Sequence, residues 1–249
     1  MSSTGFRVTS EGPVTTVTLD RPEARNAQTP AMWHSLARLA AELRGDTRVV
    51  VVKGEGPSFS AGLDRTAVPA ELAGISALSP AEAADRIAGY QAAFSWLRRP
   101  DLLTIASVQG HAIGAGFQLA LACDLRVVAD NASFAMAEIT LGLVPDLGGT
   151  KRLADLIGYS RALELCVTGR RVNAEEAARW GLANLVVPAD ELEAATSDLV
   201  AAVLAGNRDA VVEIKALLAG ASGRDFAEQE RFEREAQVRR IRDLAGLGE

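Results

Sequence analysis

Three glycines stand close together in the segment QGHAIGAGFQLALACD, which covers residues 109–124. Gly110, Gly114 and Gly116 precede an apolar run that is typical of a buried helix. Because glycine loses more backbone entropy on folding than any other residue, it is expected where the chain turns sharply or another group approaches closely. Such a segment could cradle a phosphate, bind a dinucleotide, stabilise an oxyanion or let a helix pack tightly on a strand.

Two of these alternatives do not fit the residues that follow the glycines. A Walker-type phosphate loop needs Gly-Lys-Ser or Gly-Lys-Thr, whereas Phe117 and Gln118 follow Gly116. A dinucleotide fingerprint needs a further glycine at the position that Leu119 occupies. What remains is a strand, a turn and a helix beginning near Gly114, whose first N–H groups lack an internal partner and carry the positive end of the helix dipole. These N–H groups could stabilise an oxyanion, and close packing is an equally good explanation.

A second turn of small residues, FSAGLD at 59–64, follows another apolar strand pattern. A serine nucleophile is not expected there, because the Gly-x-Ser-x-Gly pattern is absent and only His34 and His111 could serve as a base. We expect His34 to lie on the surface or in packing, and the His111 ring to hydrogen-bond to a nearby carbonyl. Two turns that offer backbone N–H groups would suffice to polarise one carbonyl oxygen.

The elements that must position these turns alternate between strand and helix in the first half of the chain. Apolar runs rich in β-branched residues predict strands at 14–19, 49–52, 102–108 and 125–129. Helices are predicted to begin after Thr29 and, through a capping box, after Ser79. Beyond Gly142 the chain is predicted to be mostly helical, with starts at Thr150, Ser160, Asn173, Asp190 and Asn207 and a charged last helix from about Asp225 to Leu244. This order predicts an α/β core with parallel strand pairing.

Composition limits the class of protein. The 249 residues are 48% hydrophobic and 23% charged, which is typical of a soluble globular protein with one large domain or a domain with a small appendage. The net charge of −6 gives no general basic excess, so nucleic acid is not an expected partner. Cys123 and Cys166 make no disulfide framework, and the sequence shows neither a signal peptide nor an apolar run long enough to cross a membrane. We expect a cytoplasmic protein that does not associate with membranes.

Five segments together resemble successive signatures of the crotonase family, the enoyl-CoA hydratase/isomerase superfamily. They cover nearly the whole chain in order: LDRPEARNAQ (19–28), GPSFSAGLD (56–64), QGHAIGAGFQLALACDLRVVA (109–129), FAMAEITLGLVPDLGGTKRL (134–153) and TGRRVNAEEAARWGLANLVVP (168–188). The resemblance implies an α/β spiral core of repeated ββα turns over 1–190 and a C-terminal helical trimerisation region over 191–249. It also implies a coenzyme A thioester as ligand, a homotrimer or a hexamer of two trimers, and neither a metal nor a further cofactor.

The resemblance also implies which groups bind the thioester. Two backbone N–H groups, those of Leu63 and Ala115, would hold its oxygen, although many family members have glycine where this chain has Ala115. Coenzyme A would be contacted at the nucleotide and pantetheine by Arg25, Asn26 and Ala27, and near the thioester by Ser60, Leu63, Asp64 and Gly114. Residues 65–78 would shape the acyl pocket.

Carboxylates decide the reaction, and here the chain departs from the two-glutamate hydratases. The position of their first glutamate is Gln118, whose amide can orient water or substrate but cannot transfer protons. The second position is Glu138, and Asp146 matches an aspartate that isomerase-like members use. Outside the resemblance, Glu138 could be a structural acid and Asp146 a helix cap.

These residues predict an acyl-CoA enzyme that forms a thioester enolate, with Glu138 or Asp146 as the base, in fatty-acid or related acyl-CoA metabolism. Return of the proton to another carbon would make it a double-bond isomerase. Addition of water, placed with help from Gln118, would make it a hydratase. The alternative from another class is a non-catalytic acyl-CoA-binding protein, which Gln118 favours and the two retained carboxylates disfavour.

Overall fold

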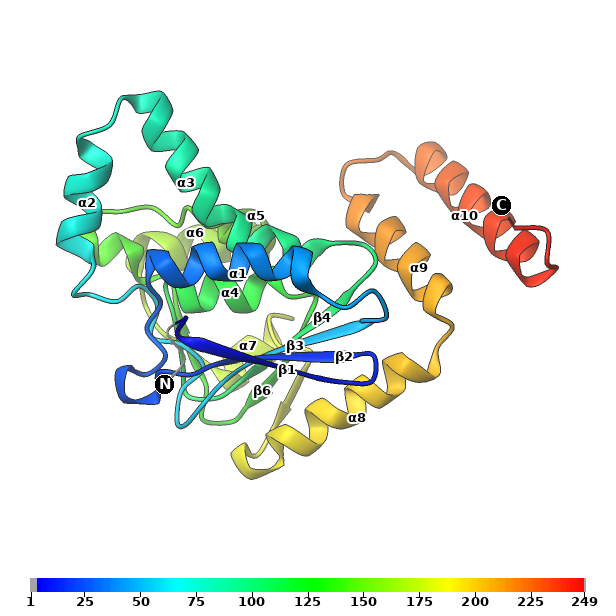
Figure 1. Ribbon diagram of the computed structural model, residues 1–249, viewed down its shortest axis with the longest axis horizontal. Helices are drawn as coiled ribbons and strands as arrows, with labels where there is room; N and C mark the ends of the chain where they lie inside the picture. The colour runs from blue at the N-terminus through cyan, green and yellow to red at the C-terminus, as the bar shows by residue number, and fades with distance from the viewer. Residues whose placement is uncertain (1–3, 249) are drawn as a thin grey trace.

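Two β-sheets surrounded by helices form the protein in the computed structural model, which describes residues 4–248 (Figure 1). The larger sheet contains, in spatial order, β1 (Phe6–Glu11), β2 (Val14–Leu19), β3 (Val49–Gly54), β4 (Leu103–Val108), β6 (Leu125–Ala129) and β9 (Leu185–Val187). β1 pairs with β2 in antiparallel fashion, and the pairs from β2 through β9 are parallel, as predicted for the core. The smaller sheet contains β5 (His111–Ile113), β7 (Ser133–Ala135) and β8 (Val172–Asn173).

Successive turns of the chain repeat one ββα pattern. The clearest turn is β4, β5 and α4 (Ala115–Ala122), in which the first strand joins the larger sheet and the second joins the smaller one. In the two preceding turns the second strand is reduced to single parallel bridges, Gln28 with Leu63 and Ser60 with Ala112. The bridges extend the smaller sheet beyond β5, one turn of the chain at a time. The repeated turns therefore form the predicted spiral.

Helices cover both faces of the larger sheet. Figure 1 shows α1 (Pro30–Glu42), α3 (Pro80–Ser95) and α4 on one face and α8 (Leu192–Ala205) on the other. Alternation along β3 explains this arrangement, because Val50 and Val52 face the main core while Val49 and Val51 pack with α8. All eight residues of α4 are buried, which confirms the buried apolar helix expected after the glycines.

The predicted helix starts are confirmed to within two residues. Thr29 caps α1 by accepting the N–H of Met32, and Ser79 forms the capping box of α3 with Glu82. The later helices are α5 (Gly149–Ile157), α6 (Tyr159–Thr168), α7 (Ala174–Arg179), α8, α9 (Arg208–Ala221) and α10 (Phe226–Leu244). Short 3₁₀ turns lie at Pro22–Ala24, Trp96–Arg98, Ala137–Leu141 and Ala189–Glu191.

The short strands β5, β7, β8 and β9 were not predicted. A further strand and a helix were not predicted either, and these two lack the usual signals. The strand β1 buries only Phe6 of its six residues, and its other apolar side chain, Val8, is exposed. The helix α2 (Val68–Ser76) has no side-chain cap and no buried residue, and therefore no apolar face. Both depend on neighbouring elements rather than on local pattern.

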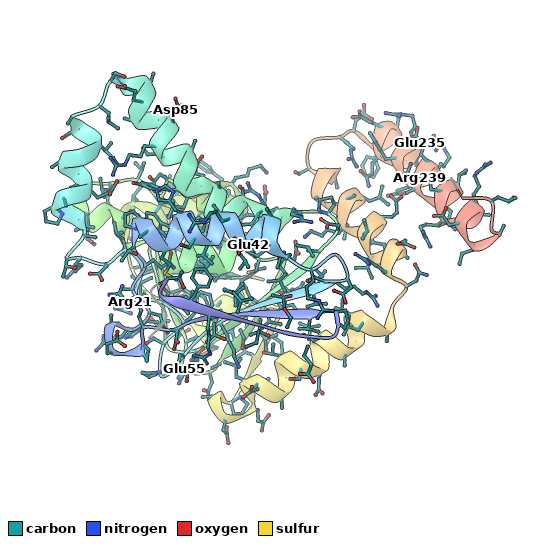
Figure 2. All side chains as sticks on the ribbon, viewed as in Figure 1. Arg21, Glu42, Glu55, Asp85, Glu235 and Arg239 are labelled. Atoms are coloured by element: carbon teal, nitrogen blue, oxygen red, sulfur yellow. The ribbon has the colours of Figure 1, made fainter. Side chains whose placement is uncertain are left out.

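The C-terminal helices α9 and α10 project from one end of the core (Figure 1). Lys215 of α9 ties this pair to the core, because its ammonium group donates to the Leu102 carbonyl and to the Asp124 carboxylate at 2.6 and 2.7 Å. In α10, Arg239 donates to Glu213 of α9 (Figure 2). Both helices leave large apolar side chains exposed, namely Ile214, Leu218, Phe226, Val238, Ile241 and Leu244.

The two cysteines are free thiols. Cys123 is fully buried, and this burial raises the pKa of its thiol to about 12, while Cys166 is half-buried. Within residues 4–248, no helix combines the length and the apolar character that crossing a bilayer requires.

Candidate active site

Two of the three glycines that open the segment at 109–124 allow the chain to pack against the turn at 59–64. A Cβ atom on Gly110 would lie 2.0 Å from the Pro57 carbonyl oxygen, and one on Gly116 would lie 2.5 Å from the Ser60 carbonyl oxygen. Both distances are far below van der Waals contact, so only glycine fits at these positions. Close packing is therefore the correct explanation for Gly110 and Gly116.

The third glycine begins α4 beside a carboxylate. Gly114 is the N-cap of α4 and has φ +53° and ψ −121°, a conformation that side chains rarely adopt. A Cβ atom there would lie 3.3 Å from Oε1 of Glu138. The N-terminus of α4 therefore lies against the Glu138 side chain.

The backbone N–H groups of Leu63 and Ala115 lie on neighbouring segments. A Cβ atom on Gly62 would lie 3.3 Å from the Ala115 nitrogen, so the Gly62–Leu63 peptide is adjacent to the start of α4. Ala115 is the first residue of α4, where an N–H has no partner within the helix. Among the described residues, neither N–H donates to a backbone carbonyl outside helices and strands. The Gly62–Leu63 peptide therefore lies beside the first residue of α4.

Gln118 joins Glu138 to the turn that carries Asp146. Its side chain is 1% exposed, and its amide nitrogen donates to Oε1 of Glu138 at 2.7 Å. Its amide oxygen accepts the N–H groups of Leu147 and Gly149 at 2.9 and 3.2 Å. Because the oxygen faces two donors and the nitrogen faces a carboxylate, the orientation of the amide is fixed by its partners. Gln118 therefore holds the carboxylate and the start of α5 in place.

Asp146 is not the N-cap of α5, so helix capping does not account for this residue. The N-cap of α5 is Gly148, which makes no side-chain capping bond, and the N–H of Gly149, the first residue of α5, donates to Gln118 instead. From α3, the Gln91 amide donates to the Asp146 carbonyl oxygen at 2.6 Å. Two glutamines on different helices thus hold the backbone of this turn, and the Asp146 carboxylate is not used in capping.

Burial makes both carboxylates unusually basic. Desolvation raises the pKa of Glu138 most, the hydrogen bond from Gln118 lowers it, and the nearby Asp146 charge raises it again. Desolvation also raises the pKa of Asp146. The Oε2 atom of Glu138 is buried and has no hydrogen-bond partner in the part of the chain that the structure describes. This atom could accept a proton from a substrate carbon or from water.

We expect stability to depend on the ionisation of Glu138. Because its pKa is raised in the folded state, the folded protein binds this proton more tightly than the unfolded chain does. The free energy of unfolding therefore falls as pH rises from the ordinary glutamate pKa through the raised value. Glu138→Gln should melt above the wild type at about pH 8 and with it at about pH 4. Calorimetry at both pH values checks this, and a variant that melts lower at about pH 8 contradicts it.

The residues expected to contact coenzyme A lie together around the loop that follows β2. Arg25 is exposed with φ +50°, and Ala27 is buried. The Asn26 amide donates to the carbonyls of Glu55 and Ser58 and accepts the Arg21 N–H, so its side chain is used within the protein. These bonds fix the loop on which Arg25 is presented.

Asp64 and Ser60 are likewise bonded within the protein. The Asp64 carboxylate pairs with Arg21, which lies on the loop after β2 (Figure 2), at 2.9 Å. Hydrogen bonds from Thr66, followed by the Arg21 contact, lower the pKa of Asp64. Ser60 is fully buried, and its hydroxyl donates to the Asn26 carbonyl. Both side chains shape the turn around Leu63.

The two histidines lie outside the carboxylate pair. His34 is exposed on α1, and its ring packs 5.5 Å from the Tyr90 ring, as expected. The expected bond between His111 and a carbonyl is not made by Nδ1, which is buried without a partner among residues 4–248. Burial, with Arg171 and Arg25 nearby, lowers the His111 pKa. No group of three or more metal-ligating side chains gathers in the described part of the chain.

Sequence reasoning missed two glutamines that act in this region. Gln91 holds the Asp146 turn from α3, and Gln28 bonds to the segment that carries Leu63. Gln28 belongs to the LDRPEARNAQ signature, but nothing in its local pattern indicates which segment it contacts.

Comparisons with known proteins agree with this geometry. The family model described as "Enoyl-CoA hydratase/isomerase" matches residues 9–243. Carnitinyl-CoA dehydratase from Salmonella enteritidis PT4 is 36% identical over 233 residues, which cover 92% of this chain and 86% of that protein. The same enzyme from Proteus mirabilis is 40% identical over 193 residues, covering 76% of this chain and 70% of that protein.

A solved structure supports the same relationship. It is a candidate enoyl-CoA hydratase from Thermobifida fusca YX in complex with acetoacetyl-CoA. The sequences are 46% identical, the TM-score is 0.93, and the similarity covers 96% of both chains.

Proposed function

The chain belongs to the enoyl-CoA hydratase/isomerase family, the crotonase superfamily, and from this premise we propose that it moves a double bond within an enoyl-CoA thioester. It is an acyl-CoA-processing enzyme of that family, and the choice of reaction is our proposal. The observation that carries it is the pair of half-buried carboxylates, Glu138 and Asp146, which are close enough for the charge of Asp146 to raise the pKa of Glu138. Gln118 cannot replace either of them in proton transfer.

The proposed reaction needs no net oxidation or reduction. Glu138 removes a proton from C2 of a 3-enoyl thioester, and the electron pair of that C–H bond moves into an enolate. The N–H groups of Leu63 and Ala115 stabilise the negative oxygen. A proton then returns at C4, which leaves the double bond between C2 and C3. Asp146 would assist at the acyl end, since its raised pKa lets a carboxyl group hold a proton closer to neutral pH.

Hydration or dehydration is the second candidate. It is favoured by relatives that are named carnitinyl-CoA dehydratase. In this reaction Glu138 would activate water for addition to C3 of a 2-enoyl thioester. The Gln118 oxygen already accepts two N–H groups, so only the second N–H of its amide would remain to place water. This limited capacity supports the isomerase over the hydratase.

Purified protein incubated with 3-enoyl-CoA and 2-enoyl-CoA thioesters of several chain lengths tests the proposal. Conversion of 3-enoyl-CoA to 2-enoyl-CoA faster than hydration of 2-enoyl-CoA is the expected result. Faster hydration identifies a hydratase instead. Saturable binding of both thioesters without turnover identifies a non-catalytic acyl-CoA-binding protein.

We also propose that the protein is a cytoplasmic homotrimer or a hexamer of two trimers. Two separate apolar surfaces support a cyclic assembly: the one on α9 and α10 and another formed by Ile139, Leu141, Val144, Tyr159, Leu163 and Val167. In this proposal the spiral core over 1–190 carries the site and the region over 191–249 supplies the contacts. Light scattering should give three or six times the chain mass of 26.2 kDa. A monomer would overturn the assembly.

A further inference from the structure

We propose that Gln28 is a positioning residue for the enolate-stabilising site, acting through the hydroxyl of Ser60. The inference rests on the proposed function, because it takes the Leu63 N–H as a donor to the thioester oxygen. Three sets of contacts carry it: backbone bonds around Leu63, side-chain bonds from Gln28, and complete burial of the groups that make them.

The backbone of Gln28 fixes the direction of the Leu63 N–H. Gln28 donates its N–H to the Gly62 carbonyl at 2.7 Å and accepts the Asp64 N–H at 2.7 Å. These are the two bonds of a parallel bridge between Gln28 and Leu63. In such a bridge the N–H of the central residue points to the opposite side. The Leu63 N–H therefore points away from Gln28, whereas the Gly62 carbonyl and the Asp64 N–H point toward it.

The side chain of Gln28 holds the same turn from within. Its amide nitrogen donates to the Ser60 hydroxyl at 3.0 Å, and its amide oxygen accepts the indole N–H of Trp33 at 2.7 Å. The Ser60 hydroxyl in turn donates to the Asn26 carbonyl at 2.8 Å and accepts the Gly62 N–H at 3.2 Å. Gly62, the residue before Leu63, is thus held at its N–H by the Ser60 hydroxyl and at its carbonyl by the Gln28 backbone N–H.

Burial makes these bonds difficult to replace with water. Gln28 and Ser60 are 0% exposed and Trp33 is 4% exposed. On the far side, the Ser60 backbone pairs with β5 through His111 and Ile113. The turn is therefore held between the segment of Gln28 and the strand that leads into α4. If Gln28 loses its side-chain amide, the Ser60 hydroxyl loses one fixed partner. The Gly62 N–H that this hydroxyl accepts is then held less firmly, and the Leu63 N–H that follows it loses its alignment.

Gln28→Met tests the inference, because methionine retains the length of the side chain and removes both hydrogen-bonding groups. We expect kcat to fall roughly 10–100-fold with KM nearly unchanged, since a small misplacement weakens stabilisation of the transition state more than binding. Ser60→Ala should show the same pattern. Ser107→Ala is the matched control, because Ser107 is a buried serine whose hydroxyl bonds to Thr196 on the other face of the larger sheet.

The ionisation midpoint of bound acetoacetyl-CoA is a measurement that a lower thermal stability of the protein does not by itself change. This thioester ionises to an enolate that absorbs in the near ultraviolet, so a pH titration of the bound ligand measures how strongly the N–H donors stabilise the oxyanion. We expect the midpoint in Gln28→Met to lie above that of the wild type by about one pH unit, which corresponds to a tenfold loss of enolate stabilisation. An unchanged midpoint together with unchanged kcat overturns the role of Gln28.

A double variant separates positioning from folding. Gln28→Met alone leaves the buried Trp33 N–H without a partner, which destabilises the fold. Gln28→Met with Trp33→Phe removes both partners and should recover thermal stability while the enolate midpoint stays raised. Recovery of the midpoint along with stability would overturn the inference. A wild type that neither turns over enoyl-CoA nor lowers the midpoint below that of free acetoacetyl-CoA would instead refute the proposed function.

Discussion

Glu138→Gln is expected to lower kcat for the best enoyl-CoA substrate by roughly 10²–10⁴-fold, the usual contribution of a general base. The substituted amide keeps the shape of the side chain, and its oxygen can still accept the 2.7 Å bond from Gln118. What disappears is the buried Oε2, which has no partner among the described residues and can accept a proton. Substrate affinity should persist, since lower kcat with retained binding indicates lost transition-state stabilisation. Steady-state kinetics and titration with a saturated acyl-CoA measure both quantities.

Asp146→Asn completes this test. If Glu138 is the principal base, the Asp146 variant keeps more turnover than Glu138→Gln, because the backbone of its turn is held by Gln91 and Gln118 rather than by its own carboxylate. Glu175→Gln, at an exposed position on α7, controls for the change of charge. An inactive Asp146→Asn beside an active Glu138→Gln would reverse the two roles.

The glycines at 110, 114 and 116 illustrate how far sequence reasoning reaches. Their position after an apolar run correctly predicted a strand followed by a buried helix that begins near Gly114. The short strand β5 lies where only a turn was expected. The sequence could not divide their roles. Gly110 and Gly116 are required by carbonyl oxygens of Pro57 and Ser60, which lie more than fifty positions earlier in the chain.

The site shows the same limit more strongly. The family signatures indicated Leu63, Ala115, Glu138 and Asp146 as candidate site residues, and the structure shows which groups surround them. The bonds made by Gln118 could not be predicted, since its partners lie 20 to 31 positions away, in the 3₁₀ turn at Ala137–Leu141, in the loop before α5 and at the start of α5. An amide has no intrinsic preference for one such partner over another. Only the packing of α4 against α5 decides where its oxygen and nitrogen point.

Ala115→Pro is expected to lower kcat by roughly 10²–10³-fold, the effect of removing one oxyanion-stabilising donor. Proline lacks an N–H group and is well tolerated as the first residue of a helix, which is the position of Ala115 in α4. The first N–H groups of a helix have no partner within it, so the change removes one donor without removing a hydrogen bond within α4. The change leaves Glu138, the proposed base, as it is.

Arg208→Pro is the matched control for this change, because Arg208 is the first residue of α9 and lies far from the carboxylates in the sequence. It should keep wild-type kcat, while Ala115→Pro should keep its helical circular dichroism and lose turnover. Titration with acetoacetyl-CoA then separates the possible causes. A folded Ala115→Pro variant with wild-type kcat would remove the Ala115 N–H from the mechanism. A folded variant that has lost both turnover and the shift in enolate ionisation supports it, because the loss of a donor to the oxyanion affects both quantities.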